Sequence, residues 1–524
     1  MDETVNPVER KRKRKSPKKD DSTKQIRGSS LLLLGKFLSI GINLATQVMM
    51  VRYLSKADFG AWGYALAIVT FFQTICTLGL ARSQTRFIPI YHEKEEYDKL
   101  FGTIALIIIT IVSTSILIIS AIFLAPELIA KLISGDSQPV SLLFIMVFLV
   151  PVDGIDRAME GMFASFVNPK AIFFRKYILA PVLRLGVVVL LILMGSTVFF
   201  LAYGYLAASI IGVLIYIVSF YFMLKKEGLL PHLDLRNINI PAKEIFAFTI
   251  PLMTSDLLSV IMHTSDTLML GYFHDTVGIA SYQAILPAVR INKMVMTSFA
   301  FLFTPLAARL FAKNDTEGIN DLYWRTAIWL AVLTFPMFAL TFSLAEPVTL
   351  SLYGERYADS WVFLSMLGFA YYFNAALGFN GMTLKVIGKV RYIMYINLAA
   401  AVINIIGNLA LIPPYGALGA TISTAGTMIV HNILKQAGLK YLGGLRIFDM
   451  KYLSVYFLIL GFGLGLFLMP LLFDIHPYIQ FAIAGLLSFA VLRLCQEKLD
   501  VEATFPELLR LPFMDKILGV KRKS

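Results

Sequence analysis

The sequence predicts an all-α polytopic membrane protein, and three observations support this fold class. Hydrophobic residues make up 57% of the 524 residues and charged residues only 15%, against about 25% charged residues in ordinary globular domains. The mean hydropathy is +0.71. Apolar runs of roughly 20 residues, the length of a helix that crosses a bilayer, recur along the chain. A soluble enzyme, a disordered chain and a disulfide-rich scaffold are therefore excluded.

Fourteen apolar runs predict about fourteen transmembrane helices in three groups. The first six form a lobe over residues 29–224, with spans at about 29–51, 60–81, 102–124, 139–163, 177–195 and 199–224. After a linker at 225–245, six more form a lobe over 246–437, with spans at about 246–272, 278–308, 326–345, 359–384, 392–412 and 417–434. Two extra helices at about 452–473 and 478–492 lie within 452–495, and a tail at 496–524 follows.

The distribution of basic residues predicts the orientation of the chain in the membrane. Cytoplasmic segments are enriched in Lys and Arg. With a cytoplasmic N-terminus, 38 of the 47 Lys and Arg residues fall in cytoplasmic segments, ten of them in a basic tail at 1–28. Four fall outside, namely Arg52, Lys56, Lys131 and Arg356. Adding or removing one helix would invert every later loop, so we expect an even number of spans with both termini cytoplasmic.

The net charge of +13 does not indicate a nucleic-acid partner, because the basic tail supplies much of it and directly precedes the first span. We interpret this tail as a topology signal; binding of lipid headgroups is the alternative. Cys76 and Cys495 have no zinc-ligand spacing, and the chain has no G-x-x-x-x-G-K-[ST] phosphate loop. We therefore expect neither a metal nor a cofactor.

Short motifs recur between the two six-helix groups at a nearly constant distance. Gly60-Ala-Trp-Gly-Tyr64 opens the second span, and Gly278-Ile-Ala-Ser-Tyr282 opens the eighth, 218 residues later. Lys170 before the fifth span corresponds to Lys389 before the eleventh. Because each group has six spans, the two lobes should be parallel and related by a pseudo-two-fold axis along the membrane normal. Transporters built in this way bind substrate between their repeats and work by alternating access.

These motifs resemble those of the multidrug/oligosaccharidyl-lipid/polysaccharide exporter superfamily, and within it the polysaccharide and O-antigen flippases. The most specific stretch is Asp266-Thr-Leu-Met-Leu-Gly271-Tyr-Phe, followed by Val277-Gly278-Ile-Ala-Ser-Tyr282-Gln-Ala. Gly35-Lys36-Phe-Leu, after a basic N-terminus, and Phe59-Gly60 are also similar. The resemblance implies a flippase that moves a polyprenyl-diphosphate-linked oligosaccharide from the cytoplasmic to the outer leaflet of the cell membrane. The implied partners are this substrate, membrane lipids and glycan-assembly enzymes.

Basic residues inside predicted spans are candidates for binding the diphosphate of such a substrate, because a charge at membrane depth costs at least about 2.5 kcal/mol. Arg290 and Lys293 lie mid-span and three residues apart, on one helix face. Lys36 and Arg184 lie nearer to the ends of their spans, where snorkelling to the headgroups is an equally good interpretation. The resemblance implies a cavity cation close to Lys36.

Acidic residues inside spans are candidates for coupling or gating. Asp153, Asp156, Arg157 and Glu160 follow one another at helical spacing in the fourth span. A self-satisfied ionic ladder along that helix is the favoured interpretation, and a coupling site or a gate between the lobes is the alternative. Asp266 belongs to the motif of the seventh span; a cap on a helix break is its alternative role.

Two other functions are weighed against the flippase. A cation-coupled multidrug exporter of the same superfamily is the main alternative. The resemblance implies twelve spans and often an acid in the first span for such an exporter, whereas this chain has fourteen predicted spans and Lys36. A membrane enzyme would need a large polar loop with catalytic residues, and the outside loops are all short.

Overall fold

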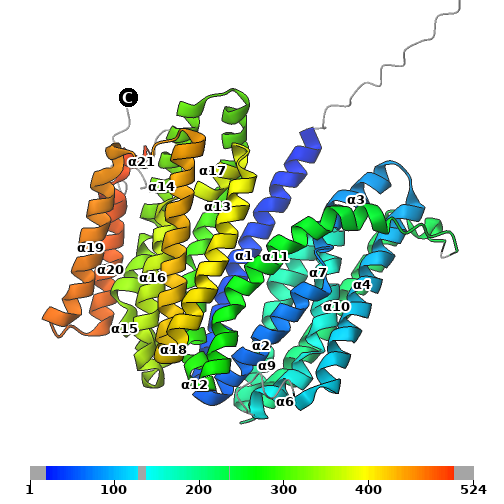
Figure 1. Cartoon of the computed structure of the whole chain (residues 1–524), viewed down its shortest axis with the longest axis horizontal. Coiled ribbons are helices and arrows are strands. Elements are labelled where there is room, and N and C mark those ends of the chain that lie inside the picture. Colours follow the sequence, from blue (N-terminus) through cyan, green and yellow to red (C-terminus); the bar gives the residue numbers. More distant parts are fainter. Residues whose placement is uncertain (1–18, 128–136, 235, 501–524) are drawn as a thin grey trace, which may run out of the picture.

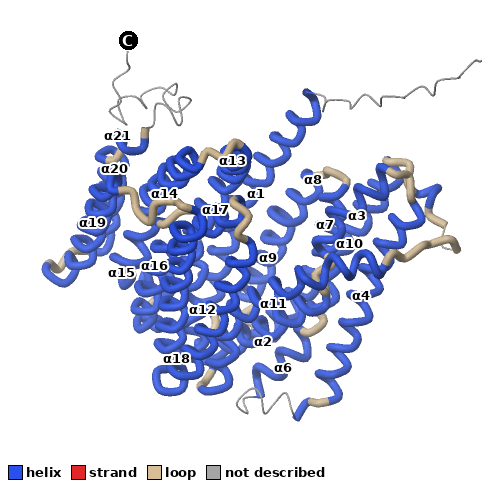
Figure 2. Tube along the Cα trace, turned by 45° about the horizontal axis from the view of Figure 1, so that its top comes forward, coloured by secondary structure: helices blue, strands red, loops and turns tan. Residues whose placement is uncertain are grey.

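The computed structural model describes residues 19–127, 137–234 and 236–500, and every regular element within these ranges is a helix. A chain surrounded by lipid must satisfy its backbone hydrogen bonds internally, which helices do. Most of the basic tail, Lys131 and nearly all of the C-terminal tail lie outside the described residues. The described chain begins and ends at the same end of the helical bundle (Figures 1 and 2). We call the opposite end the distal end.

The helices form two groups that lean apart toward the end at which the chain begins and ends (Figure 1). The N-lobe helices are α1 (Lys19–Tyr53), α2 (Lys56–Cys76), α3 (Ala81–Glu93), α4 (Tyr97–Leu124), α6 (Ser137–Met146), α7 (Leu149–Ser165), α8 (Pro169–Ile172), the π-helix η1 (Phe173–Leu179), α9 (Ala180–Leu193) and α10 (Val198–Lys226). The short η2 (Leu230–His232) follows in the linker.

The second group continues from α11 to the end of the described chain. The C-lobe helices are α11 (Ala242–Phe273), α12 (Thr276–Arg290), α13 (Asn292–Ala312), α14 (Thr316–Phe338), η3 (Ala339–Ser343), α15 (Ala345–Tyr353), η4 (Glu355–Ser360), α16 (Trp361–Ala376), α17 (Asn380–Val386) and α18 (Val390–Gly443). After η5 (Met450–Tyr452) come α19 (Leu453–Leu472), α20 (Pro477–Leu494) and the short α21 (Gln496–Leu499). The exact lobe boundaries stay a prediction.

The predicted all-helical membrane fold is confirmed. Ten helices of the described part are long and apolar enough to cross a membrane, or up to twelve if each of two bent pairs is one span. Helix α18 counts once among these ten, although its backbone turns at Gly416 (φ 54°, ψ −129°) after Pro413 and Pro414. The 32-residue α11 is not among the ten. Dividing α18 and adding α11 would give fourteen; that exact number stays a prediction.

Two glycines, Gly60 and Gly271, let the two lobes pack closely at the distal end. A Cβ atom at Gly60 of α2 would collide with the Thr276 carbonyl at the start of α12. A Cβ atom at Gly271 of α11 would likewise collide with the Tyr64 ring of α2. Only glycine permits such close approach of two helices. Gly60 and Tyr64, which belong to the first copy of the repeated motif, are therefore residues at which α2 packs against α12 and α11.

Helix α11 connects the two lobes along its length. Near its start, Glu244 accepts a hydrogen bond from the Tyr91 hydroxyl of α3 at 3.1 Å. Farther along α11, Asp256 forms an ion pair with Arg82 of α3. The last turns of α11 pack on α2 and α18 instead. Helix α11 thus begins against α3 of the N-lobe and ends between α2 of the N-lobe and α18 of the C-lobe.

Candidate functional site

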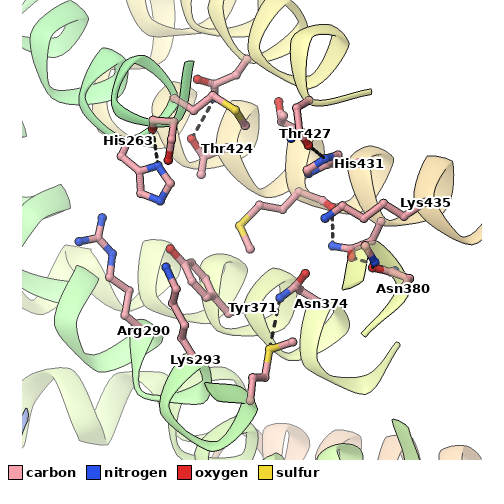
Figure 3. Close-up of a pocket in the computed structure, with 18 of the residues that line it drawn as sticks. His263, Arg290, Lys293, Tyr371, Asn374, Asn380, Thr424, Thr427, His431 and Lys435 are labelled. Carbon is pink, nitrogen blue, oxygen red and sulfur yellow. Dashed lines mark hydrogen bonds between the residues drawn. The ribbon is translucent and has the colours of Figure 1, made fainter. Parts of the chain in front are cut away.

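A cavity of about 660 Å³ lies inside the C-lobe. Its walls come from α11, α12, α13, α16, α17 and both halves of α18, so every lining residue falls between Leu258 and Lys435. Figure 3 shows basic side chains on two sides of this cavity, Arg290 and Lys293 on one and Lys435 on the other. Asparagine, threonine and methionine side chains line much of the space between them.

The cavity carries an excess of positive charge. Four basic side chains line it, Arg290, Lys293, Lys385 and Lys435, against a single carboxylate, that of Asp266. Among the described residues none of these four basic side chains forms an ion pair. Lys435 is half-buried, and the other three are exposed. A cavity with unpaired cations is suited to an anionic ligand.

Arg290 and Lys293 both line the cavity, as their spacing predicted, although they do not lie in one continuous helix. Arg290 ends α12, and Lys293 lies in the first turn of α13 after a turn at Ile291. Pro287 accounts for part of this irregularity, because proline lacks the N–H that would bond to the Gln283 carbonyl. That carbonyl accepts a hydrogen bond from Gln47 of α1 instead, at 3.2 Å.

Lys36 reaches the edge of the cavity from the other lobe. Its Nζ donates a hydrogen bond to Thr297 Oγ1 of α13 at 3.0 Å, and Thr297 lines the cavity. Its positive charge also acts on that of Lys293. Neighbouring Gly35 lets α1 pack closely on η1, since a Cβ there would collide with the Phe173 ring. Lys36 therefore lies where α1 meets α13, with its ammonium group engaged by the protein.

Arg184 does not line the cavity. Its guanidinium lies over the Tyr205 ring of α10, 5.6 Å from the ring centre, within the N-lobe. Helix α9 directs this side chain toward α10 and away from the C-lobe. A role for Arg184 in binding substrate stays a prediction.

The charged residues of α7 do not form the ladder along their own helix that the sequence favoured. Asp156 pairs with Arg175 of η1, with 2.8 Å between Oδ1 and the guanidinium, a close ion pair without hydrogen-bond geometry. Glu160 pairs with Lys176 of η1 at 2.6 Å. The acids found better partners because the next span approaches α7 with two adjacent cations.

The two remaining charged residues of α7 share a third side chain. Gln73 of α2 donates a hydrogen bond to Asp153 Oδ2 at 2.7 Å and accepts one from Arg157 at 3.3 Å. Gln73 is buried, and Arg157 is exposed. The amide therefore links the acid and the base, which are one helical turn apart. Coupling or gating by Asp153, Asp156, Arg157 and Glu160 stays a prediction.

Asp266 lies at the centre of a buried polar network beside the cavity. Its Oδ2 accepts hydrogen bonds from the Tyr282 hydroxyl at 2.6 Å and from Thr424 Oγ1 at 2.7 Å, and its Oδ1 accepts one from Asn408 Nδ2 at 2.7 Å. Asp266 is only 3% exposed. Helix α11 is continuous through this residue, so the alternative of a cap on a helix break is wrong. Both Asp266 and Tyr282 come from the motif that carried the family resemblance.

The sequence missed a second group of cavity residues. Lys385 of α17, His431 and Lys435 of α18 line the cavity, and hydropathy had placed both lysines in cytoplasmic loops. Helix α18 continues to Gly443, beyond the predicted end at 434, and so carries Lys435 on its cavity side. The spacing of His431 and Lys435, one helical turn apart, was the available signal.

Basic residues at the distal end clasp the two lobes together. Arg52, in the last turn of α1, donates hydrogen bonds to the carbonyls of Ser351 and Leu352 in α15, and Arg356 of η4 donates to the carbonyl of Arg52. Lys56 pairs with Asp359 at 3.1 Å. We call these contacts the distal clasp. They engage three of the four basic residues that the orientation rule placed outside.

Comparisons with known proteins agree with this architecture. The family described as polysaccharide biosynthesis protein matches residues 26–311, more than half of the chain, and the MatE family matches residues 251–410. An uncharacterised membrane protein of Methanocaldococcus jannaschii is 21% identical over 76% of this chain and 81% of its own length. The succinoglycan biosynthesis transport protein ExoT of Rhizobium meliloti is 24% identical over 64% of each chain.

Solved transporter structures share the fold. The lipid II flippase MurJ in an inward closed conformation superposes with a TM-score of 0.70 at 17% identity, covering 90% of this chain and 99% of its own. An inward-facing multidrug resistance MATE transporter gives a TM-score of 0.64 at 14% identity, covering 78% of this chain and 96% of its own. The match to the family over residues 26–311 and the two-lobe helical fold lead to one conclusion. The chain belongs to the polysaccharide biosynthesis protein family and is a multi-pass membrane transporter of the multidrug/oligosaccharidyl-lipid/polysaccharide superfamily.

Proposed function

We propose that the chain is a flippase that moves a polyprenyl-diphosphate-linked oligosaccharide from the cytoplasmic to the outer leaflet by alternating access. The observation that carries this proposal is the C-lobe cavity, whose four unpaired basic side chains face one fully engaged carboxylate. The relatives are consistent with it, since one is a lipid II flippase and another a succinoglycan transport protein.

Arg290 and Lys293 are the proposed ligands of the diphosphate. An Arg guanidinium offers a planar fork of donors to two phosphate oxygens, and a Lys ammonium offers a movable point charge. Their side chains lie together on one side of the cavity (Figure 3). Two adjacent cations would offset much of the cost of desolvating two phosphate charges.

Lys36 is the proposed contact at the entrance. Its hydrogen bond to Thr297 joins α1 to α13 at the cavity edge. An arriving diphosphate offers Lys36 a charged acceptor in place of a neutral hydroxyl, and charged acceptors bind roughly twice as strongly. Substrate would therefore separate α1 from α13 and draw Lys36 toward Arg290 and Lys293.

The distal clasp is the proposed closed gate. With the predicted orientation it lies on the outer face, where it ties the end of α1 to α15 and η4. Arg52 and Arg356 bond to backbone carbonyls across the lobes, and such exposed bonds are weak enough to break during a transport cycle. Release to the outer leaflet requires their opening.

Asp266 is the proposed coupling group. Three side-chain donors stabilise its carboxylate, but no basic side chain among the described residues pairs with it. A buried carboxylate without a countercharge is suited to binding a monovalent cation. Because its donors come from α12 and both halves of α18, loading Asp266 would change how these helices pack. Asp266→Asn should keep the geometry but make transport insensitive to the ion gradient.

A cation-coupled multidrug exporter is the second candidate, favoured by the match of the MatE family to residues 251–410. An organic cation would need a free carboxylate in the cavity. The Asp266 carboxylate is buried and already accepts three hydrogen bonds, and the cavity is otherwise basic. The charge of the cavity therefore favours the flippase.

Reconstituted protein separates the two functions. Proteoliposomes would receive a polyprenyl-diphosphate-linked trisaccharide with a fluorescent label on its sugar, and dithionite added outside would report the fraction in the outer leaflet. We expect protein-dependent exchange between leaflets and no uptake of ethidium in parallel vesicles. Ethidium transport without lipid exchange would establish the exporter instead.

A further inference from the structure

We propose that Lys385 and Lys435 form a second anion subsite in the cavity, which binds an acidic group on the glycan itself. The substrate would then be an acidic oligosaccharide, carrying for example a uronate carboxylate. This inference rests on the proposed flippase function and names its substrate class. It starts from the observation that the cavity has two groups of basic side chains on different helices.

Local packing directs both lysines to the same space. Asn380 at the start of α17 donates a hydrogen bond to Asn432 Oδ1 of α18 at 3.3 Å, and both asparagines are buried. This bond fixes α17 against α18. A Cβ atom at Gly381 would lie 3.6 Å from the Lys435 side chain, so the lysine stem runs along the glycine. Lys385 follows four residues after Gly381, one helical turn along α17.

The ammonium groups of Lys385 and Lys435 repel each other, and no carboxylate among the described residues balances them. The positive charge of Lys385 acts unfavourably on that of Lys435. In the described part of the chain neither lysine forms an ion pair. Lys435 is half-buried and Lys385 is exposed, so solvent screens this repulsion only in part. Two cations held together in this way would be relieved by an anion between them.

Neutral polar side chains beside the lysines suit the rest of a sugar. His431, one turn before Lys435, hydrogen-bonds through Nε2 to Asn397 Oδ1 at 2.9 Å, and both residues line the cavity. Thr427, one turn before His431 in α18, is buried, and its hydroxyl has no hydrogen-bond partner among the described residues. A sugar ring presents hydroxyl groups that can donate to and accept from such side chains.

The position of the subsite assigns it to the glycan and not to the diphosphate. Arg290 and Lys293, together with Lys36 at the entrance, are on the side of the cavity formed by α12 and α13. Lys435 lies across the cavity on α18 (Figure 3). A diphosphate held at Arg290 and Lys293 would leave the attached sugars to fill the remaining space toward α17 and α18.

Binding and transport of two matched probes test the inference. Both are polyprenyl-diphosphate-linked trisaccharides, one ending in glucuronic acid and the other in glucose. Affinities would be measured in detergent by intrinsic fluorescence, and exchange between leaflets in proteoliposomes. The variants are the double substitution Lys385→Gln/Lys435→Gln, its conservative counterpart Lys385→Arg/Lys435→Arg, and the control Lys440→Gln. Lys440 is exposed on the same helix and does not line the cavity.

We expect the unaltered protein to bind the glucuronic acid probe at least about tenfold more tightly than the glucose probe, as hydrogen bonds to a charged group allow. The Gln double variant should lose this preference yet bind the glucose probe as before. The Arg variant and Lys440→Gln should keep the preference. Equal affinity for both probes in the unaltered protein would overturn the inference, and so would an equal loss for both in the Gln variant.

The two measurements separate the inference from the proposed function. If neither probe crosses the membrane, the flippase proposal fails whatever the binding shows. If both cross and bind equally, the flippase proposal stands and the acidic subsite is rejected. A preference for glucuronic acid that persists in the Gln double variant would place its cause elsewhere in the cavity and would also reject the subsite.

Discussion

The two lobes use charged side chains within the membrane in opposite ways. In the N-lobe, Asp156 and Glu160 of α7 each face a cation of η1, Arg175 and Lys176. In the C-lobe, four basic side chains share one cavity and none of them has a carboxylate partner among the described residues. The charges of the N-lobe pairs cancel within the protein, whereas the cations of the C-lobe cavity need an anionic ligand to balance them. Pairing within the protein thus distinguishes charges that hold the fold from charges that are available to a ligand.

The largest expected effect comes from removing two of the unpaired cations of the C-lobe cavity. Arg290→Gln/Lys293→Gln should reduce translocation of the lipid-linked probe by roughly a hundredfold or more, because two charge-assisted bonds at about 1.5–3 kcal/mol each are lost. Expression and melting temperature should be unchanged, since neither residue forms an ion pair with a described residue that the substitution would break. Exchange between leaflets in proteoliposomes measures the effect.

Arg309→Gln is the matched control for that double variant. Arg309 is exposed near the end of α13 and does not line the cavity. Its substitution should leave transport intact. Normal transport by the Arg290 and Lys293 double variant would remove the proposed diphosphate site.

The next largest effect comes from breaking an ion pair of the N-lobe, which should lower the stability of the protein. Arg175 is 4% exposed, contacts Asp156 and lies over the Tyr216 ring. Arg175→Leu leaves the Asp156 charge unpaired at depth, which typically costs about 3–5 kcal/mol. We expect a lower melting temperature in detergent and poor expression. Restored stability in Arg175→Leu/Asp156→Leu would attribute the loss to the stranded charge.

Gly212 offers a second way to disturb the same pair. A Cβ atom there would collide with the Arg175 guanidinium, so Gly212→Ala should displace the arginine and lower the melting temperature. Gly461 of α19 is the control, because a Cβ there would meet nothing within 4 Å. If both alanine variants melt alike, the packing of Arg175 is not what stabilises the N-lobe.

Lys36 tests whether an N-lobe cation also serves the ligand, because it belongs to the N-lobe in sequence and contacts the edge of the C-lobe cavity. Lys36→Gln keeps a donor for Thr297 but removes the charge, so we expect about a tenfold loss of transport. Lys36→Arg should retain function, since a planar fork also suits phosphate. Lys36→Glu should abolish transport by repelling the diphosphate. A fully active Gln variant would exclude Lys36 from the site.

The fold was predictable because the bilayer imposes it. Membrane thickness sets the length of an apolar run, and this alone located most helices to within a few residues. Spans that extend beyond the membrane were shortened, as at α14, which begins at Thr316 and not at 326. The turn of α18 at Gly416 falls between the predicted spans 392–412 and 417–434, after two prolines, which each lack the N–H of a helical hydrogen bond.

The site was predictable only where a charge interrupts an apolar run. Arg290 and Lys293 are conspicuous in this way, and both line the cavity. Lys385 and Lys435 were counted as loop residues because hydropathy ends a span at the first charge, although α18 continues past Lys435. The partners of Asp156 and Glu160 were missed for another reason. Their cations come from η1, and only the tertiary packing of η1 on α7 shows this.

The smallest expected effect concerns Lys176 and Glu160, the more exposed of the two pairs that join α7 to η1. Their side chains are 44% and 32% exposed, against 5% and 25% for Arg175 and Asp156. Water and headgroups screen an exposed pair, whose worth is typically about 0.2–1 kcal/mol. Lys176→Gln should therefore lower the melting temperature only slightly and leave transport unchanged. The same measurement on Arg175→Leu gives the reference. A loss as large as that of Arg175→Leu would mean that Lys176 holds the lobe together despite its exposure, and that pairing matters more than burial in the N-lobe.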